Sequence, residues 1–245
     1  MTGVHWIALF ALILASWTAL YLMAVPAELR ALGHLYGADF WAEFCRVTPD
    51  AAGYLRISAM WMLMSAGMMA PTVLPALATY DDIGNAGPTR FGSLLAGYLA
   101  VWLGFAALAA GLQLGLFNAG LVSAFGDSRS GLLTAALLAL AGGYQFSPMK
   151  EACLSRCRAP LTFFFQHWHE GPWRMGLRLG LVCLGCCWAL MLLAFAGGVM
   201  NLGFMGLAML LMVTEKLPQL GRPLTKPLGG LLLALAGWSA LTAVT

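Results

Sequence analysis

The chain has 245 residues, of which 61% are hydrophobic and 9% are charged, whereas roughly a quarter of the residues in an ordinary soluble domain are charged. This composition argues against a soluble domain and predicts an integral membrane protein in contact with lipid. The net charge is +3, and because the basic residues lie outside the centres of the apolar segments, we expect no nucleic-acid partner.

Seven apolar segments are candidates for membrane-spanning helices, because a helix needs roughly 20 apolar residues to cross the hydrocarbon core. We therefore predict an all-α, polytopic helix bundle that forms a single domain over residues 1–245. The fourth segment is the shortest, so six spans are the alternative. The candidate spans cover about 4–25, 57–79, 91–117, 130–146, 176–198, 202–217 and 225–244.

The basic residues predict the orientation of these spans. With seven spans, one side of the membrane holds Arg90, Lys150, Arg156, Arg158, Arg174, Arg178, Lys216, Arg222 and Lys226, and the other holds Arg30, Arg46, Arg56 and Arg129. The positive-inside rule then places the N-terminus in the cytoplasm and the C-terminus outside. Six spans would leave only Arg90 on the poorer side, which is a sharper bias. We prefer seven because residues 132–141 are almost all Leu and Ala, which are costly to expose to water.

Three of the six cysteines, Cys183, Cys186 and Cys187, lie close together inside an apolar segment. On a helix, Cys183, Cys187 and Met191 share one face, and Cys186 lies just beside it. Thiol and thioether ligands select Cu(I), and less sharply Zn(II), over ions that prefer oxygen. Free cysteine also packs as a small hydrophobe, but three thiols at this spacing favour a metal site.

The second candidate span contains five of the 14 methionines within residues 60–69. Met60, Met64 and Met68 share one helix face, and their thioethers would bind Cu(I) weakly; the alternative is that methionine fills gaps between helices. Pro71 and Pro75 follow in the same span. Each proline frees a backbone carbonyl that a neighbouring group or a cavity must satisfy.

Two further cysteines, Cys153 and Cys157, are four residues apart and would share one face of a short helix after Pro148. Nearby arginines favour the thiolate form that binds metal, although an uninvolved pair of reduced thiols explains the pattern nearly as well. For His167 and His169, we favour a position at the membrane interface over a metal site.

Polar groups elsewhere give weaker signals. The loop at 26–56 carries aromatic residues typical of an interfacial helix, with His34 and Cys45 interpreted as an exposed imidazole and a packed thiol. Glu215 and Lys216 close the sixth span, where we expect their side chains to reach toward the interface. No hydrolase, phosphate-binding or dinucleotide-binding motif is present, so we expect no such enzyme activity.

Four segments together resemble a family of bacterial integral membrane proteins that are predicted to bind metal. The similarity spans roughly residues 56 to 220 and lies at 60–72, 144–157, 183–191 and 198–201. The resemblance implies a protein of the bacterial inner membrane, with metal ligands in the cysteine-rich and methionine-rich segments.

These observations favour a non-enzymatic protein that binds Cu(I) for uptake, transfer or delivery. The predicted ligands are Cys183, Cys186, Cys187, Met191, Met60, Met64, Met68, Cys153 and Cys157. The affinity for Cu(I) would rise from the thioethers to the thiolates, so the ion could pass from the methionines to the cysteines. This transfer requires the two groups to be neighbours, so we expect Met64 or Met68 to face Cys183 and Cys187 across a helix interface.

Two alternatives stay open. One is an accessory subunit of a larger membrane complex or a homo-oligomer, because paired glycines suit close helix packing. The other is a thiol-disulfide oxidoreductase, because Cys183 and Cys186 have the C-x-x-C spacing that supports a reversible disulfide.

Overall fold

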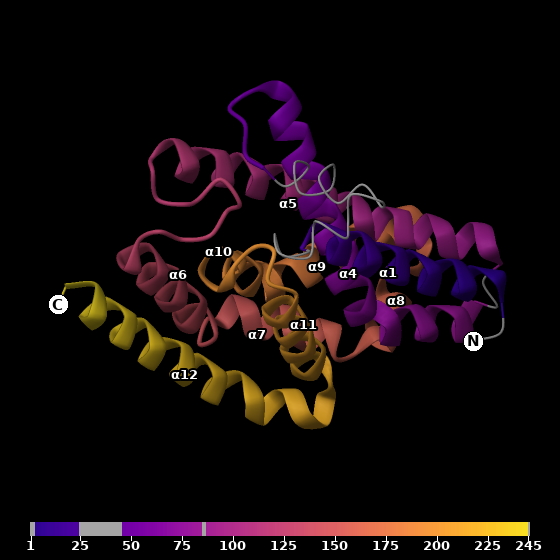
Figure 1. The fold of residues 1–245 in the computed structure, drawn as a ribbon. Coiled ribbons are helices and arrows are strands. Elements are labelled where there is room, and N and C mark those ends of the chain that lie inside the picture. The colour runs from indigo at the N-terminus through magenta and orange to yellow at the C-terminus, as the bar shows by residue number, and fades with distance from the viewer. Residues whose placement is uncertain (1–2, 25–45, 85–86, 245) are drawn as a thin grey trace.

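A computed structural model of the chain describes residues 3–24, 46–84 and 87–244. These residues form an all-helical fold (Figure 1), and the predicted interfacial helix, His34 and Cys45 lie largely or wholly outside them. The helices are α1 (Val4–Met23), α4 (Ala51–Gly84), α5 (Pro88–Asn118), α6 (Gly131–Tyr144), α7 (Pro148–Cys157), α8 (Pro160–His167), the 3-10 turn η2 (Trp168–Glu170), α9 (Pro172–Leu192), α10 (Ala194–Gly197), α11 (Leu202–Lys216) and α12 (Pro218–Val244).

Seven spans are not confirmed. Five helices among the described residues are long and apolar enough to cross a membrane, namely α1, α4, α5, α9 extended to Gly197, and α12. A sixth candidate consists of α6 and α7 together, but the two are bent by 64° at the break between them. Helix α11, over the sixth predicted span, has 15 residues, which at 1.5 Å per residue is too short to cross a typical hydrocarbon core unaided.

Local sequence signals explain where several helices begin. Pro88, Pro148, Pro160 and Pro172 each start a helix, where the missing N–H of proline costs no hydrogen bond. The hydroxyl of Ser130 caps α6 by accepting from the Leu133 amide, and the side chain of Asn201 caps α11. These caps satisfy amide groups that the first helical turn leaves free.

Helix α4 is continuous through both of its prolines. Pro71 leaves the carbonyl of Gly67, four residues earlier, without its helical donor. The indole Nε1 of Trp17 on α1 donates to that carbonyl at 3.0 Å, so the neighbouring helix satisfies the freed group as predicted. This bond fixes α1 against the middle of α4.

Glycines let α5 and α9 pack closely. A Cβ atom added at Gly176 would collide with the Leu94 carbonyl oxygen, and one added at Gly180 would lie 2.9 Å from the Cβ of Val101. Small residues of this kind permit close backbone approach between apolar helices. The contact holds α9, which carries three of the cysteines, at a fixed position against α5.

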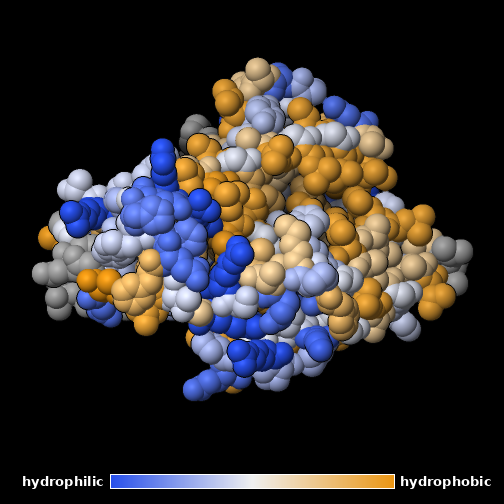
Figure 2. All heavy atoms as spheres, turned by 180° about the vertical axis from the view of Figure 1, so that it is seen from behind, coloured by the Kyte–Doolittle hydropathy of each residue, from blue (hydrophilic) through white to orange (hydrophobic). Residues whose placement is uncertain are grey.

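Many large hydrophobic side chains remain exposed on the described part of the chain, including Leu14 (67%), Leu108 (76%) and Trp238 (70%). Figure 2 shows that hydrophobic residues cover much of one face, while hydrophilic residues gather toward one side and the lower edge. Exposed apolar patches of this extent mark contact with a membrane or a partner.

Candidate metal centre

The three cysteines of α9 bring their sulfur atoms together inside the bundle. The Sγ atoms of Cys183, Cys186 and Cys187 all lie within 4.8 Å of one another. Each of the three residues is at most 2% exposed, and the Sγ atoms of Cys186 and Cys187 are 3.2 Å apart. No other group of three His, Cys, Asp or Glu side chains in the described residues has this spacing.

A lysine from α11 contacts this thiol cluster. The ammonium group of Lys216 donates to Cys183 Sγ at 2.9 Å and to Thr72 Oγ1 at 2.6 Å. Lys216 is 8% exposed, and no carboxylate of the described residues forms a salt bridge with it. An ammonium group beside a sulfur favours the thiolate, the form that binds metal.

The prediction that Lys216 reaches toward the membrane interface is therefore wrong. Its side chain points into the helix bundle, because the thiol of Cys183 and the hydroxyl of Thr72 satisfy two of its N–H groups there. The only signal in the sequence was a charged residue at the end of an apolar segment, and such residues often have a function when they lie inside a membrane.

Tyr98 of α5 completes the polar surroundings of Cys183. Its hydroxyl lies 3.0 Å from Cys183 Sγ and donates to the Met69 carbonyl at 3.1 Å. Tyr98 is fully buried, and sequence reasoning missed it, because a tyrosine in an apolar helix has no spacing signature. Four helices thus contribute to the surroundings of one sulfur: α4, α5, α9 and α11.

A second buried lysine lies next to the centre. The ammonium of Lys150 and the carboxylate of Glu215 form an ion pair of 2.8 Å, and both side chains are 1% exposed. The guanidinium of Arg158 donates to the Glu215 backbone carbonyl at 2.9 Å. These contacts tie α7 to the C-terminal end of α11. Lys150 and Lys216, which the predicted orientation places in loops, are both buried.

The second pair of cysteines lies on α7, as the predicted short helix requires. Cys157 is half-buried and lines a small pocket of about 20 Å³ together with Cys183, Thr72 and Lys216. Cys153 packs against Gly185, where an added Cβ would lie 2.6 Å from the cysteine sulfur. Both thiols therefore lie beside the α9 cysteines.

The predicted methionine ligands lie near the α9 cysteines along the chain direction of the helices. On the α4 side, Thr72 Oγ1 lies 3.9 Å from Cys183 Sγ. Met64 and Met68 line a void with Met191, one helical turn beyond Cys187. Met60 is buried but does not line this void.

The histidines at 167 and 169 join no metal-binding group within the described chain. His167 Nδ1 lies 2.8 Å from the Phe163 carbonyl. His169 belongs to η2 and is exposed. Glu170 belongs to the same turn. The guanidinium of Arg178 on α9 donates a hydrogen bond to its carboxylate and lowers the pKa of that carboxyl.

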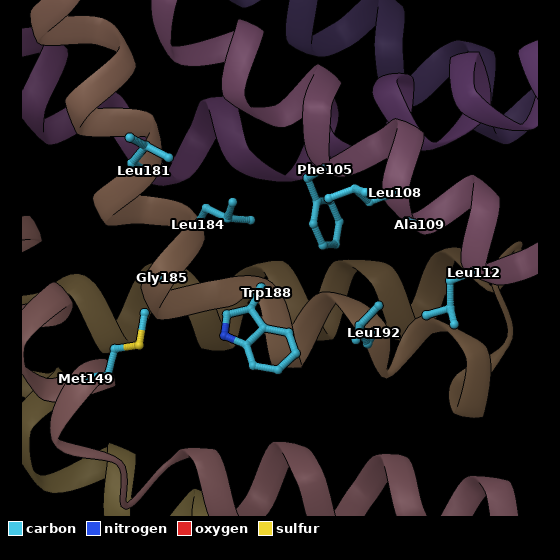
Figure 3. A pocket seen from close by; sticks show the side chains of 10 residues that line it. All are labelled: Phe105, Leu108, Ala109, Leu112, Met149, Leu181, Leu184, Gly185, Trp188 and Leu192. Atoms are coloured by element: carbon cyan, nitrogen blue, oxygen red, sulfur yellow. The ribbon is translucent and has the colours of Figure 1, made fainter.

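An apolar groove of about 420 Å³ lies between α5 and α9. Figure 3 shows Phe105 and Leu108 of α5 opposite Leu184 and Trp188 of α9, with Met149 at one end. Gly185 also lines the groove, and the Tyr144 hydroxyl donates to the Gly185 carbonyl. The groove thus reaches the backbone of the cysteine segment, but no thiol lines it.

Comparison with known proteins places these observations in a family. Searches of curated proteins and of solved structures gave no match. The model of the PpoB2 family, described as copper chaperones, matches residues 58–239. The match covers most of the chain, including the thiol cluster, Thr72, Tyr98 and Lys216. The chain belongs to the PpoB2 copper chaperone family.

Proposed function

We propose that the protein is a copper chaperone of the bacterial inner membrane that binds Cu(I) through Cys183, Cys186 and Cys187. The observation that carries this proposal is the convergence of three buried sulfur atoms within 4.8 Å in a chain of a copper chaperone family. Soft thiolate ligands match Cu(I) in chemical preference.

The ligand set favours Cu(I) over zinc. Structural zinc sites are almost always tetrahedral and take four protein ligands. The thiol cluster offers three sulfur atoms within 4.8 Å of one another, and no histidine or carboxylate of the described residues joins it. Cys157 lines the pocket beside the cluster but does not belong to this group of three. Several thiolates that hold one monovalent cation form a complex with a net negative charge. The ammonium group of Lys216, 2.9 Å from Cys183 Sγ, offsets this charge.

Cys157 gives the bound ion a route out of the centre. It lines the same small pocket as Cys183 and Lys216 and is partly accessible. A thiol at this position can replace one cysteine of the cluster as a ligand, so that the ion is never free. We propose that Cys157, with Cys153 beside it, receives copper for transfer to an acceptor protein.

Localisation in the membrane is supported by the apolar helices and by their exposed surface. Five described helices are long and apolar enough to span a bilayer, or six with the bent pair. Leucines on the outside of these helices, such as Leu108 and Leu181, remain exposed. A lipid environment would cover this surface without a partner.

The test is a titration of the purified full-length protein in detergent with Cu(I), in competition with a chromophoric Cu(I) chelator. The parent is expected to bind a tight equivalent that C183A/C186A/C187A has lost. The matched control is M149A, which truncates an exposed sulfur-containing side chain outside the cluster and should retain the tight equivalent. The same titration with Zn(II) should show weaker binding to the parent.

Thermal unfolding of each variant in detergent shows whether it is folded. A folded triple variant that binds Cu(I) as tightly as the parent contradicts the proposal. A stable Cys183–Cys186 disulfide in protein isolated without oxidant would instead support a thiol oxidoreductase.

A further inference from the structure

Four methionines from three helices line one small void. Met64 and Met68 come from α4, Met191 from α9 and Met205 from α11. All four are buried, at 3% exposure or less. Sequence reasoning did not single out Met205, because it belongs to a different apolar segment and only the packing of α11 brings it here.

The void lies next to the thiol cluster along the bundle. Met191 follows Cys187 by four residues on α9, and Met68 precedes Thr72 by four residues on α4, so each pair is separated by one helical turn. On the other side of the void, Trp61 of α4 contacts Phe195 of α10, with ring centroids 5.3 Å apart. The methionines thus lie between an aromatic contact and the thiols.

The chemistry of the void is restricted to thioethers. Its volume is about 10 Å³, and the remaining lining residues are Leu190, Ala194, Phe204 and Ala208. A buried water needs two to four polar partners, and no side chain with an oxygen or nitrogen atom lines this space. A hard or hydrated cation would find no side-chain oxygen ligand, whereas Cu(I) and its analogue Ag(I) accept sulfur.

Methionine also serves as a flexible filler in apolar cores, and filling explains single methionines well. It does not require four thioethers from three helices to line the same void. Nor does it explain why the void continues the faces that carry Thr72 and the cysteines.

We propose that Met64, Met68, Met191 and Met205 form a second Cu(I) site composed only of thioethers. This inference rests on the proposed function, because it assigns the methionine site as the position that Cu(I) occupies before the thiols. A thioether has no proton to lose and no charge, so it binds Cu(I) more weakly than a thiolate. The ion therefore moves from the methionines to the cysteines with increasing affinity.

The experiment is a titration of the full-length protein in detergent with Ag(I). A second titration uses Cu(I) under anaerobic conditions. The parent is expected to bind a tight and a weak equivalent. The variant M64L/M68L/M205L should lose the weak equivalent and keep the tight one, because leucine conserves volume at buried methionine positions. C183A/C186A/C187A should lose the tight equivalent and keep the weak one.

Two variants serve as matched controls. M60L changes a buried methionine on the same face of α4 that does not line the void, and M149L changes an exposed methionine. Both should retain the two equivalents. X-ray absorption of the triple alanine variant loaded with one Cu(I) should show sulfur neighbours without oxygen or nitrogen.

The possible failures are distinguishable. If M64L/M68L/M205L binds both equivalents as the parent does, the methionine site is wrong while the cysteine site stands. Loss of the weak equivalent in M60L or M149L equally contradicts the assignment. If the triple alanine variant retains the tight equivalent, the proposed function fails whatever the methionine variants show.

Discussion

The ammonium nitrogen of Lys216 lies 2.9 Å from the sulfur of Cys183, although the two residues are 33 positions apart on different helices. Both side chains are buried, and a buried charge without a partner is costly. The pair therefore indicates a thiolate that the lysine stabilises, at the centre of the proposed copper site.

Replacing this lysine should weaken copper binding. In Lys216→Leu, the thiolates lose a charged hydrogen bond, which contributes about 1.5–3 kcal/mol, so we expect roughly a 10–100-fold weaker affinity for Cu(I). Competition with a chromophoric chelator measures the change. Lys226→Leu, an exposed lysine of α12, should leave the affinity unchanged, and equal affinity in both variants would contradict the role of Lys216.

The buried ion pair between Lys150 and Glu215 should be essential for stability. In Glu215→Gln, the Lys150 charge loses its partner, which typically destabilises a protein by about 3–5 kcal/mol. The melting temperature in detergent should fall clearly. The double variant K150L/E215L should recover much of the loss, since it leaves no unpaired charge.

Glu151 offers the control for that experiment. It contacts Arg158 at 3.4 Å, but its side chain is 63% exposed. Because exposed ion pairs contribute little, Glu151→Gln should melt close to the parent. An equal effect of Glu151→Gln and Glu215→Gln would show that burial of the pair is unimportant.

Close packing of α5 and α9 makes a separate prediction. In Gly176→Ala, the new methyl group would collide with the Leu94 carbonyl oxygen, and overpacking of this kind costs about 1–3 kcal/mol. Gly104→Ala lies on α5 with nothing within 4 Å of the added atom and should be neutral or slightly stabilising. Thermal unfolding of the two variants compares them directly.

The proposed membrane topology can be tested by labelling single cysteines with an impermeant maleimide, in a background where the native accessible cysteines are serine. Phe125→Cys lies in the segment between α5 and α6, and Gln166→Cys lies on α8. We expect Phe125→Cys to react in intact cells and Gln166→Cys only after permeabilisation. Labelling of both from the same side would show that the segment at 130–146, the fourth predicted span, does not cross the membrane.

Much of the local structure was predictable, because it depends on short-range patterns. The apolar segments at 4–25 and 91–117 correspond to the helices Val4–Met23 and Pro88–Asn118. The short helix after Pro148 and the shared face of Cys183 and Cys187 follow from helical periodicity. The fourth and sixth apolar segments were each predicted to be a membrane span. The structure has a bend after the fourth segment and a helix of 15 residues in the sixth, and hydropathy alone does not show where a helix bends or ends.

The partners of each sulfur could not be predicted. Thr72, Tyr98 and Lys216 surround Cys183, and they come from three apolar helices with no common motif. Met205, Met64 and Met191 likewise come from three different helices and line one void. Helical periodicity states which residues share a face, but not which faces meet.

A helical, apolar chain with three thiols and several thioethers on defined helix faces follows from composition and the helical repeat alone, because both act locally. The inward direction of Lys216, the position of Thr72 beside Cys183 and the void shared by four methionines depend on tertiary packing. These outcomes depend on how α4, α9 and α11 pack, which is set by side-chain fit and by the need to satisfy buried charges.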